Sequence, residues 1–217
     1  ANGGSYVTED GQFGLNQPEA IEVLDALGKM VTDYHVAPSP AAVKSLPSTA
    51  ISLTTSQAAI IMIGQWVLLD LAESGVPFGV GVLPKINADA QYVTSPGWGT
   101  VGIFTSTEHP EEAYLFWKWL CDPVNSVEVH KAGLWMPLMS EWYTNPEYVS
   151  LWAEDNPAHP EGYTEAVMMP LYEHFAKHPS AFVRNFAEID AIVLPALERI
   201  FMGEAGAQEA MDAIEAE

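Results

Sequence analysis

Residues 58–84, AAIIMIGQWVLLDLAESGVPFGVGVLP, constrain the fold of this chain more than any other stretch. Residues 58–63 are apolar without interruption, which is typical of a strand in a sheet covered on both faces. Residues 67–73 form a short apolar helical pattern, and in 78–82 apolar residues alternate with glycines as in a second strand. The stretch therefore predicts an α/β core. It also places the turn that carries Trp66 at the carboxyl end of a buried strand, where ligands bind in open α/β sheets.

Helical patterns account for most of the remaining sequence. Asn16 is predicted to cap a helix with Pro18 in its first turn. Further helices are predicted over 49–57, 110–121, 124–132, 146–154, 165–177, 188–201 and 207–217, and residues 100–105 are predicted to form another strand. Pro170 and Pro195 lie inside helical patterns and predict kinks or breaks. Strands mixed with helices, followed by helices alone, indicate an α/β lobe covered by a C-terminal helical layer.

Charge and composition exclude several classes of protein. Among 217 residues, 8 are Lys or Arg and 29 are Asp or Glu, which gives a formal net charge of −21. A polyanion would be repelled by this charge, so nucleic acid is excluded as a partner. With 48% hydrophobic residues the chain can build a real core, and no run of residues approaches the length of about 18 apolar residues that a membrane span needs.

The residues that most often carry catalysis or metals do not form a recognisable constellation. Cys121 is the only cysteine, so no intramolecular disulfide and no thiolate cluster can form, and its helical context predicts a small buried apolar residue. The six histidines lack metal-ligand spacing, and the carboxylates show no paired arrangement. No nucleophile elbow, P-loop or dinucleotide fingerprint is present. We therefore expect neither a catalytic site, nor a metal, nor a cofactor.

Tryptophan is unusually abundant, with seven residues. Trp117 is predicted to be buried, Trp119 to be partly exposed on the same helix, and Trp142 and Trp152 to pack in the helical layer. Three others lie in glycine-flanked turns: Trp66, Trp98 and Trp135. An indole on a loop offers a flat apolar face with one donor at its rim, which suits a pyranose ring. Packing within the protein is an equally open interpretation for each of the three.

Several short motifs occur in a fixed order along the chain. They are Asn2-Gly3-Gly4, NQPEA at 16–20, AAIIMIGQW at 58–66, FGVGVLP at 78–84, GWG at 97–99, HPEEA at 109–113, and a last helix with Gly203 and Glu209-Ala210. In this order they resemble the extracellular solute-binding proteins of ABC sugar importers (solute-binding family 1), which include the maltodextrin-binding and glycerol-phosphate-binding proteins.

The resemblance implies an α/β fold of the periplasmic-binding-protein-like type II. The chain would correspond mainly to the C-terminal lobe: its first part over 1–91, a segment crossing to the N-terminal lobe over 92–136, and its helical second part over 137–217. The opening strands of the N-terminal lobe are absent from this sequence, so we expect a chain cut from a longer one. Such a chain would give a ligand only part of its contacts and would expose apolar surface that favours self-association.

The resemblance also implies a set of ligand-binding residues, with none catalytic and none binding metal: Gly3, Gly4, Trp66, Gly97, Trp98, Trp135, Arg184 and Asn185. The implied function is that of a non-enzymatic protein that binds a sugar or oligosaccharide in a cleft between two lobes and delivers it to ABC permease subunits. The implied location is the periplasm, or an anchored lipoprotein position on the outer face of a bacterial or archaeal membrane. A carbohydrate-active hydrolase and a protein-interaction module with exposed tryptophans remain the alternatives.

Overall fold

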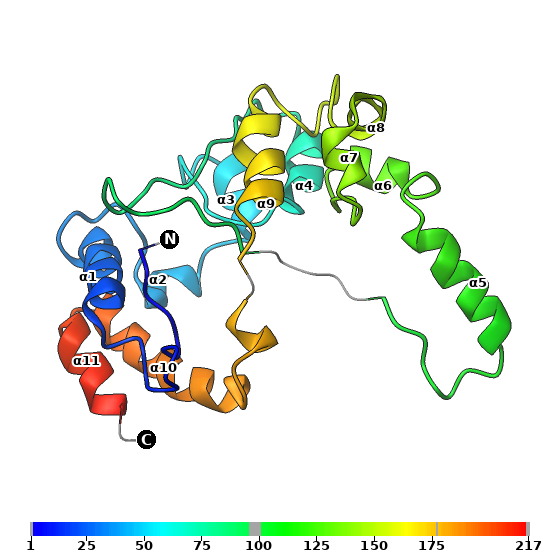
Figure 1. Ribbon diagram of the computed structural model, residues 1–217. Coiled ribbons are helices and arrows are strands. Elements are labelled where there is room, and N and C mark those ends of the chain that lie inside the picture. Colours follow the sequence, from blue (N-terminus) through cyan, green and yellow to red (C-terminus); the bar gives the residue numbers. More distant parts are fainter. Residues whose placement is uncertain (1, 96–100, 177, 216–217) are drawn as a thin grey trace. The chain divides into compact units, whose positions relative to one another are not determined.

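The computed structural model describes residues 2–95, 101–176 and 178–215, and the regular elements in this part of the chain are helices (Figure 1). None of these helices is long and apolar enough to span a bilayer. Contacts divide the chain into two units, which we call the first unit (Ala1–Pro47, Pro84–Val93 and Ala176–Glu217) and the second unit (Ser48–Leu83 and Thr94–Phe175).

The first unit is built around three packed helices. Its elements are α1 (Pro18–Thr32), α2 (Pro40–Val43), the 3₁₀-helix η2 (Pro179–Ala181), α10 (Phe186–Phe201) and α11 (Ala207–Ile214). Helix α10 packs against both α1 and α11, and Ile200, Ala210 and Met211 lie at the centre of their shared core. A Cβ at Gly28 of α1 would come within 3.1 Å of Ile200 Cγ2, so α1 and α10 approach closely at this glycine.

The second unit has a core rich in aromatic rings. Its elements are α3 (Thr49–Thr54), α4 (Val67–Ser74), α5 (Pro110–Cys121), α6 (Val127–Lys131), α7 (Glu141–Thr144), α8 (Pro146–Trp152), the π-helix η1 (Thr164–Met168) and α9 (Met169–Glu173). The apolar face of α4 packs with Trp142, Trp152 and Tyr163 into one buried cluster. The predicted packing roles of Trp142 and Trp152 are confirmed, since both are buried.

The predicted strands are not formed among the described residues. Residues 58–63 contain no ladder, and the side chain of Ile60 is 89% exposed where a buried strand was expected. Residues 78–82 and 101–104 are likewise irregular, and Thr100 lies outside the described residues. The only β-bridges in the described part are Val7 with Phe13 and Thr94 with Phe175. Apolar pattern favours a strand, but a strand also needs a neighbouring backbone to pair with, and the described residues do not supply one.

Most predicted helices are present, with shifted ends. Helix α1 begins at Pro18, but its N-cap is Gln17 and not Asn16, and no side chain caps it. The predicted interruption near Pro170 is confirmed, because the π-helix η1 gives way there to α9. Helix α10, in contrast, runs through Pro195 without a break.

Helix α5 is present as predicted, but its apolar side chains are not buried. No residue of α5 is buried, so Trp117 and Cys121 are only half-buried where burial was expected. Trp117 Nε1 donates to the carbonyl oxygen of Val101 at 3.0 Å, and its ring stacks on Tyr114 of the same helix at a centroid distance of 6.1 Å. Trp119 is exposed, as expected. The helical pattern was therefore interpreted correctly, whereas the surface that would bury it is not among the described residues.

Candidate functional site

The first unit contains an open groove of about 980 Å³ that brings together three segments far apart in sequence. The N-terminal residues 3–14 line one part, the start of α1 another, and residues 182–184 with Ile189 of α10 a third. Three of the predicted ligand-binding residues, Gly3, Gly4 and Arg184, lie in this lining. Their convergence was not visible from their positions in the sequence.

The glycines of this groove allow the N-terminal segment to lie close to α1. Gly3 has a φ of +92°, which an L-residue rarely adopts. A Cβ at Gly4 would come within 3.0 Å of the Ala20 backbone, so a side chain there would push the segment away from the helix. These glycines are therefore needed for the local fold, whatever binds in the groove.

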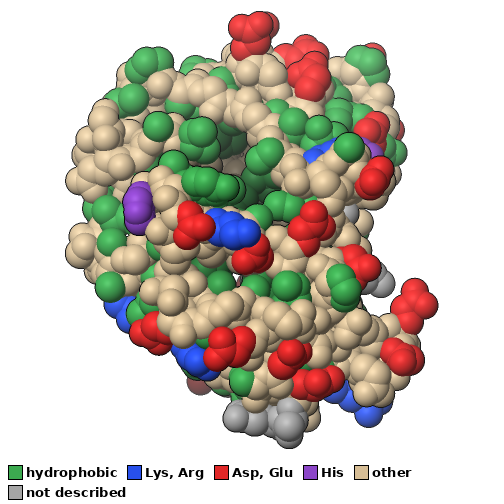
Figure 2. All heavy atoms as spheres, turned by 90° about the vertical axis from the view of Figure 1, so that its left-hand side faces the viewer, with side chains coloured by type: hydrophobic (Ala, Val, Ile, Leu, Met, Phe, Trp, Pro, Cys, Tyr) green, Lys and Arg blue, Asp and Glu red, His purple; other side chains and the backbone are tan. Residues whose placement is uncertain are grey.

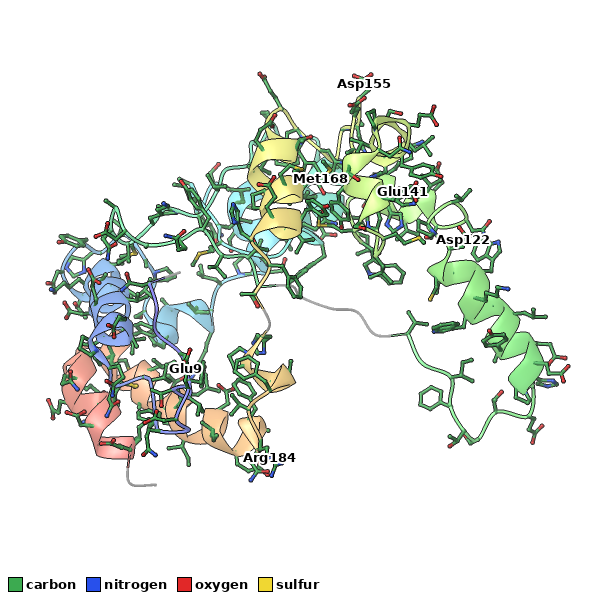
Figure 3. The ribbon with its side chains drawn as sticks, in the orientation of Figure 1. Glu9, Asp122, Glu141, Asp155, Met168 and Arg184 are labelled. Atoms are coloured by element: carbon green, nitrogen blue, oxygen red, sulfur yellow. The ribbon has the colours of Figure 1, made fainter. Side chains whose placement is uncertain are left out.

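The charged side chains of the groove are of both signs. Arg184 takes part in none of the ion pairs found among the described residues, so its guanidinium donors face solvent. Glu9 and Glu19 line the same groove (Figure 3 labels Glu9 and Arg184). A ligand with hydroxyl groups can accept hydrogen bonds from the guanidinium and donate to the carboxylates. Asn185 is not part of the lining; it precedes α10 with a φ of +54°.

Trp66 lies in the second unit, at the N-terminus of α4. Its side chain is 50% exposed, and its backbone is the N-cap of the helix. A Cβ on Gly64 would overlap the six-membered ring of the Trp66 indole, so the ring occupies the space that a side chain at position 64 would fill. The glycine thus fixes where the indole lies and leaves part of it open to solvent.

Gln65, between these two residues, holds the turn by two hydrogen bonds from distant parts of the chain. Its Nε2 donates to the carbonyl oxygen of Gly133 at 3.1 Å, and the hydroxyl of Tyr163 donates to its Oε1 at 2.6 Å. Tyr163 is 2% exposed, and burial raises the pKa of its phenol well above the usual range, so it stays a donor. Sequence reasoning missed Gln65 and Tyr163. The one available signal was a polar residue set between two apolar runs.

The same contacts connect the Trp66 turn to the loop of Trp135. Gly133 has a φ of +80°, as its predicted place after helix α6 requires, and Trp135 follows two residues later with 37% of its side chain exposed. The buried His130 donates from Nδ1 to the carbonyl oxygen of Trp135 at 3.0 Å, and burial lowers the pKa of this imidazole. The structure therefore links the turns of Trp66 and Trp135. The predicted Gly97 and Trp98 lie outside the described residues.

A second, smaller hollow of about 450 Å³ lies in the second unit beside the aromatic core. Its lining includes His159 and four carboxylates, of Glu154, Asp155, Glu161 and Glu165. The His159 ring stacks on Tyr163 at a centroid distance of 4.0 Å, its Nδ1 donates to the carbonyl oxygen of Trp152 at 3.0 Å, and burial lowers its pKa to about 4. Among the described residues, no three His, Cys, Asp or Glu side chains are grouped so that they could hold a metal ion.

Acidic side chains are spread widely over the surface. On the face shown in Figure 2 they lie at many separate places and clearly outnumber the Lys and Arg side chains, in keeping with the net charge of −21. This face offers no basic stripe for a nucleic-acid backbone. The features suited to a ligand are therefore a mixed-charge groove in the first unit and a pair of linked tryptophan turns in the second.

Comparisons with known proteins are informative about the fold. No protein-family model matches the sequence. No curated protein matches it either. Among solved structures, the chain is similar to an ABC substrate-binding protein from Listeria monocytogenes in complex with cycloalternan, with a TM-score of 0.78 and 22% sequence identity. The match covers 99% of this chain and 52% of that one, so the chain spans about half the length of this structural relative.

This likeness shows the fold. Over 99% of its length the chain has the fold of about half of that substrate-binding protein, which agrees with the expected periplasmic-binding-protein-like fold. The type II class and the assignment to the C-terminal lobe stay predictions. The α/β character expected with it is not seen in the described residues, where helices are the regular elements.

Proposed function

We propose that this chain binds a sugar or an oligosaccharide as the solute-binding component of an ABC importer and delivers it to the permease in the membrane. The observation that carries the proposal is the likeness of its fold to that of a substrate-binding protein solved with a carbohydrate. The chain's own chemistry supports the same ligand class, since it presents exposed indoles and a groove with free donors and acceptors.

The sugar contacts are proposed in both units. In the first unit, Gly3, Gly4 and Arg184 line the groove, and Asn185 adjoins it in sequence. In the second unit, Trp66 and Trp135 offer indole faces for the C–H side of a pyranose ring. Gly97 and Trp98 complete the proposed set on the strength of the sequence resemblance alone.

The proposal also covers the location of the protein, its lack of catalytic activity and the assignment of its lobes. We place the protein in the periplasm or anchored at the outer face of the membrane, as a binding protein without catalytic activity. Residues 1–91 and 137–217 are assigned to the C-terminal lobe, and 92–136 to a segment that crosses to the N-terminal lobe. Each of these assignments is an inference from the family resemblance and the fold.

The test compares two tryptophans of nearly equal exposure. Trp66 is 50% exposed and Trp119 of α5 is 51% exposed, but only Trp66 is proposed to bind sugar. The wild-type chain is titrated with maltotriose, isomaltotriose and cellotriose by calorimetry, and ligand-observed NMR extends detection to millimolar affinity. Trp66→Ala should weaken binding about thirtyfold, the loss expected for a central aromatic contact, and Trp119→Ala should leave it unchanged.

Each other result of these measurements would support a different conclusion. Binding that survives Trp66→Ala and falls with Trp119→Ala would move the site to α5. No binding of any of these or other saccharides, either by this chain or by one extended at its amino end, would reject the sugar-binding function itself. Turnover of a glycoside by the wild-type chain would favour the hydrolase alternative.

A further inference from the structure

Tyr163 is a buried residue with no proposed contact to a ligand, yet its hydroxyl is directed to the turn that carries Trp66. The ring lies in the aromatic core, edge-on to Trp152 at 6.1 Å and stacked on His159. Core packing therefore holds the phenol in place independently of its hydroxyl. The hydroxyl donates to Gln65 Oε1 at 2.6 Å, a short hydrogen bond between two side chains 98 residues apart.

Gln65 restrains the position of the neighbouring Trp66 through both its side chain and its backbone. Because its Oε1 accepts from Tyr163 and its Nε2 donates to Gly133, the amide is fixed at both ends and cannot rotate. Its backbone carbonyl accepts from the N–H of Leu68 at 2.9 Å in the first turn of α4. Side chain and backbone of Gln65 thus define the path of the chain into Trp66, whose indole lies where Gly64 leaves room.

We propose that Tyr163 is a positioning residue for sugar binding: through Gln65 it holds the Trp66 indole in the orientation that stacks on a pyranose ring. The inference rests on the proposed function, of which it specifies one part. A ring held in place before the ligand arrives loses less conformational freedom on binding, and this raises affinity without a new contact. Tyr163 itself touches no sugar.

The chain contains a closely matched control. Tyr143 belongs to the same buried cluster, and its hydroxyl also makes a single buried hydrogen bond, to the carbonyl oxygen of Pro137 at 2.7 Å. That bond has no connection to Gln65. Tyr163→Phe and Tyr143→Phe each remove one hydroxyl from a buried ring, so both should lower stability by similar amounts in urea unfolding. Only Tyr163→Phe should change sugar affinity through Trp66, since Pro137 belongs to the loop of Trp135.

The experiment is a double-mutant cycle between Tyr163 and Trp66 on the full chain. Trp66→Phe is used because a smaller ring keeps binding measurable. The ligand is whichever of maltotriose, isomaltotriose and cellotriose binds the wild-type chain best. Tyr163→Phe should weaken binding about threefold to tenfold when Trp66 is present, and by less than twofold when position 66 is phenylalanine. Tyr143→Phe should weaken it by less than twofold in both backgrounds.

Each result bears on the proposal. An equal loss from Tyr163→Phe in both backgrounds would show that Tyr163 does not act through Trp66, and the inference would be wrong. The same holds if Tyr143→Phe weakens binding as much as Tyr163→Phe, since the effect would then be one of core stability. If Trp66→Phe itself has no effect on binding, the tryptophan site is wrong. If neither the wild type nor a chain extended at its amino end binds a saccharide, the proposed function fails and this inference with it.

Discussion

Replacing Gly133 by alanine tests how closely the loop of Trp135 packs on α4 and on Ala158. The backbone φ of Gly133 is +80°, and a Cβ built there would come within 2.9 Å of Leu68 Cβ and 3.1 Å of Ala158 Cβ. Both neighbours are the stiff first atoms of buried side chains, so neither can move aside cheaply. Alanine at this position therefore combines backbone strain with overpacking.

The second unit also contains a control for the cost of the left-handed backbone alone. Gly162 has a φ of +85°, but a Cβ there would meet nothing within 4 Å. Left-handed backbone costs an L-residue about 1–2 kcal/mol, and ordering of the unfolded chain by alanine offsets about 0.4–1 kcal/mol of this. Gly162→Ala should therefore lower the free energy of unfolding by about 1 kcal/mol. Gly133→Ala adds an overpacking cost of about 1–3 kcal/mol and should lower it by about 2–4 kcal/mol.

Urea unfolding followed by circular dichroism measures both variants against the wild type, with equal slopes required for the comparison. Gly133→Ala should unfold at the lower urea concentration of the two. Equal destabilisation by both substitutions would show that the Leu68 contact is absent in solution. The close packing of the Trp135 loop on α4 would then be wrong, and only the Gln65–Gly133 hydrogen bond would connect the two turns.

Two further predictions concern the stability of the protein in acid and the surface through which chains associate. Since the folded pKa of His159 is about 4 and its ordinary value is 6.5, its stabilising contribution is complete above about pH 6.5 and is lost as the pH falls to about 4. Between pH 6.5 and pH 4 the free energy of unfolding of the wild type should therefore fall by up to about 3 kcal/mol more than that of His159→Gln. If the two free energies fall in parallel with pH, the prediction is wrong. Phe116→Glu on the exposed face of α5 should reduce self-association in light scattering more than Leu138→Glu, although Leu138, which lies off this helix, is more exposed (85% against 63%). Equal effects would exclude α5 as the associating surface.

Helices were predictable from the sequence because their determinants are local. Pro110 followed by two glutamates, with apolar residues at spacing of three and four, was sufficient to place the start of α5 at its first residue. The left-handed Gly133 was likewise expected after a helix. The N-cap of α1 shifted by one residue, since no side chain caps that helix and only Pro18 fixes its start.

The strands and the candidate groove depend on contacts between residues distant in sequence, and they were predicted less well than the helices. The apolar run 58–63 gave no information on whether a partner strand would be available, and burial of Ile60 was wrongly expected. Arg184 was predicted as a site residue, yet nothing in its neighbourhood indicated that Glu9 and Glu19 would line the same groove. Gln65 acquires its role only from Tyr163 and Gly133, each far along the chain.

The turn of Trp66 does not depend on whether residues 58–63 pair into a sheet. The preceding segment lies unpaired in the described structure, and unpaired apolar backbone is a template for association with another chain. The turn itself is held from its other side, by the helix that begins at Val67 and by hydrogen bonds from Gln65 to residues within the second unit. Pairing of the segment can therefore change the solubility and stability of the protein while leaving the Trp66 indole where it is. For this reason the tests on Trp66 and Tyr163 do not depend on pairing of this segment, and association through α5 can be measured separately from them.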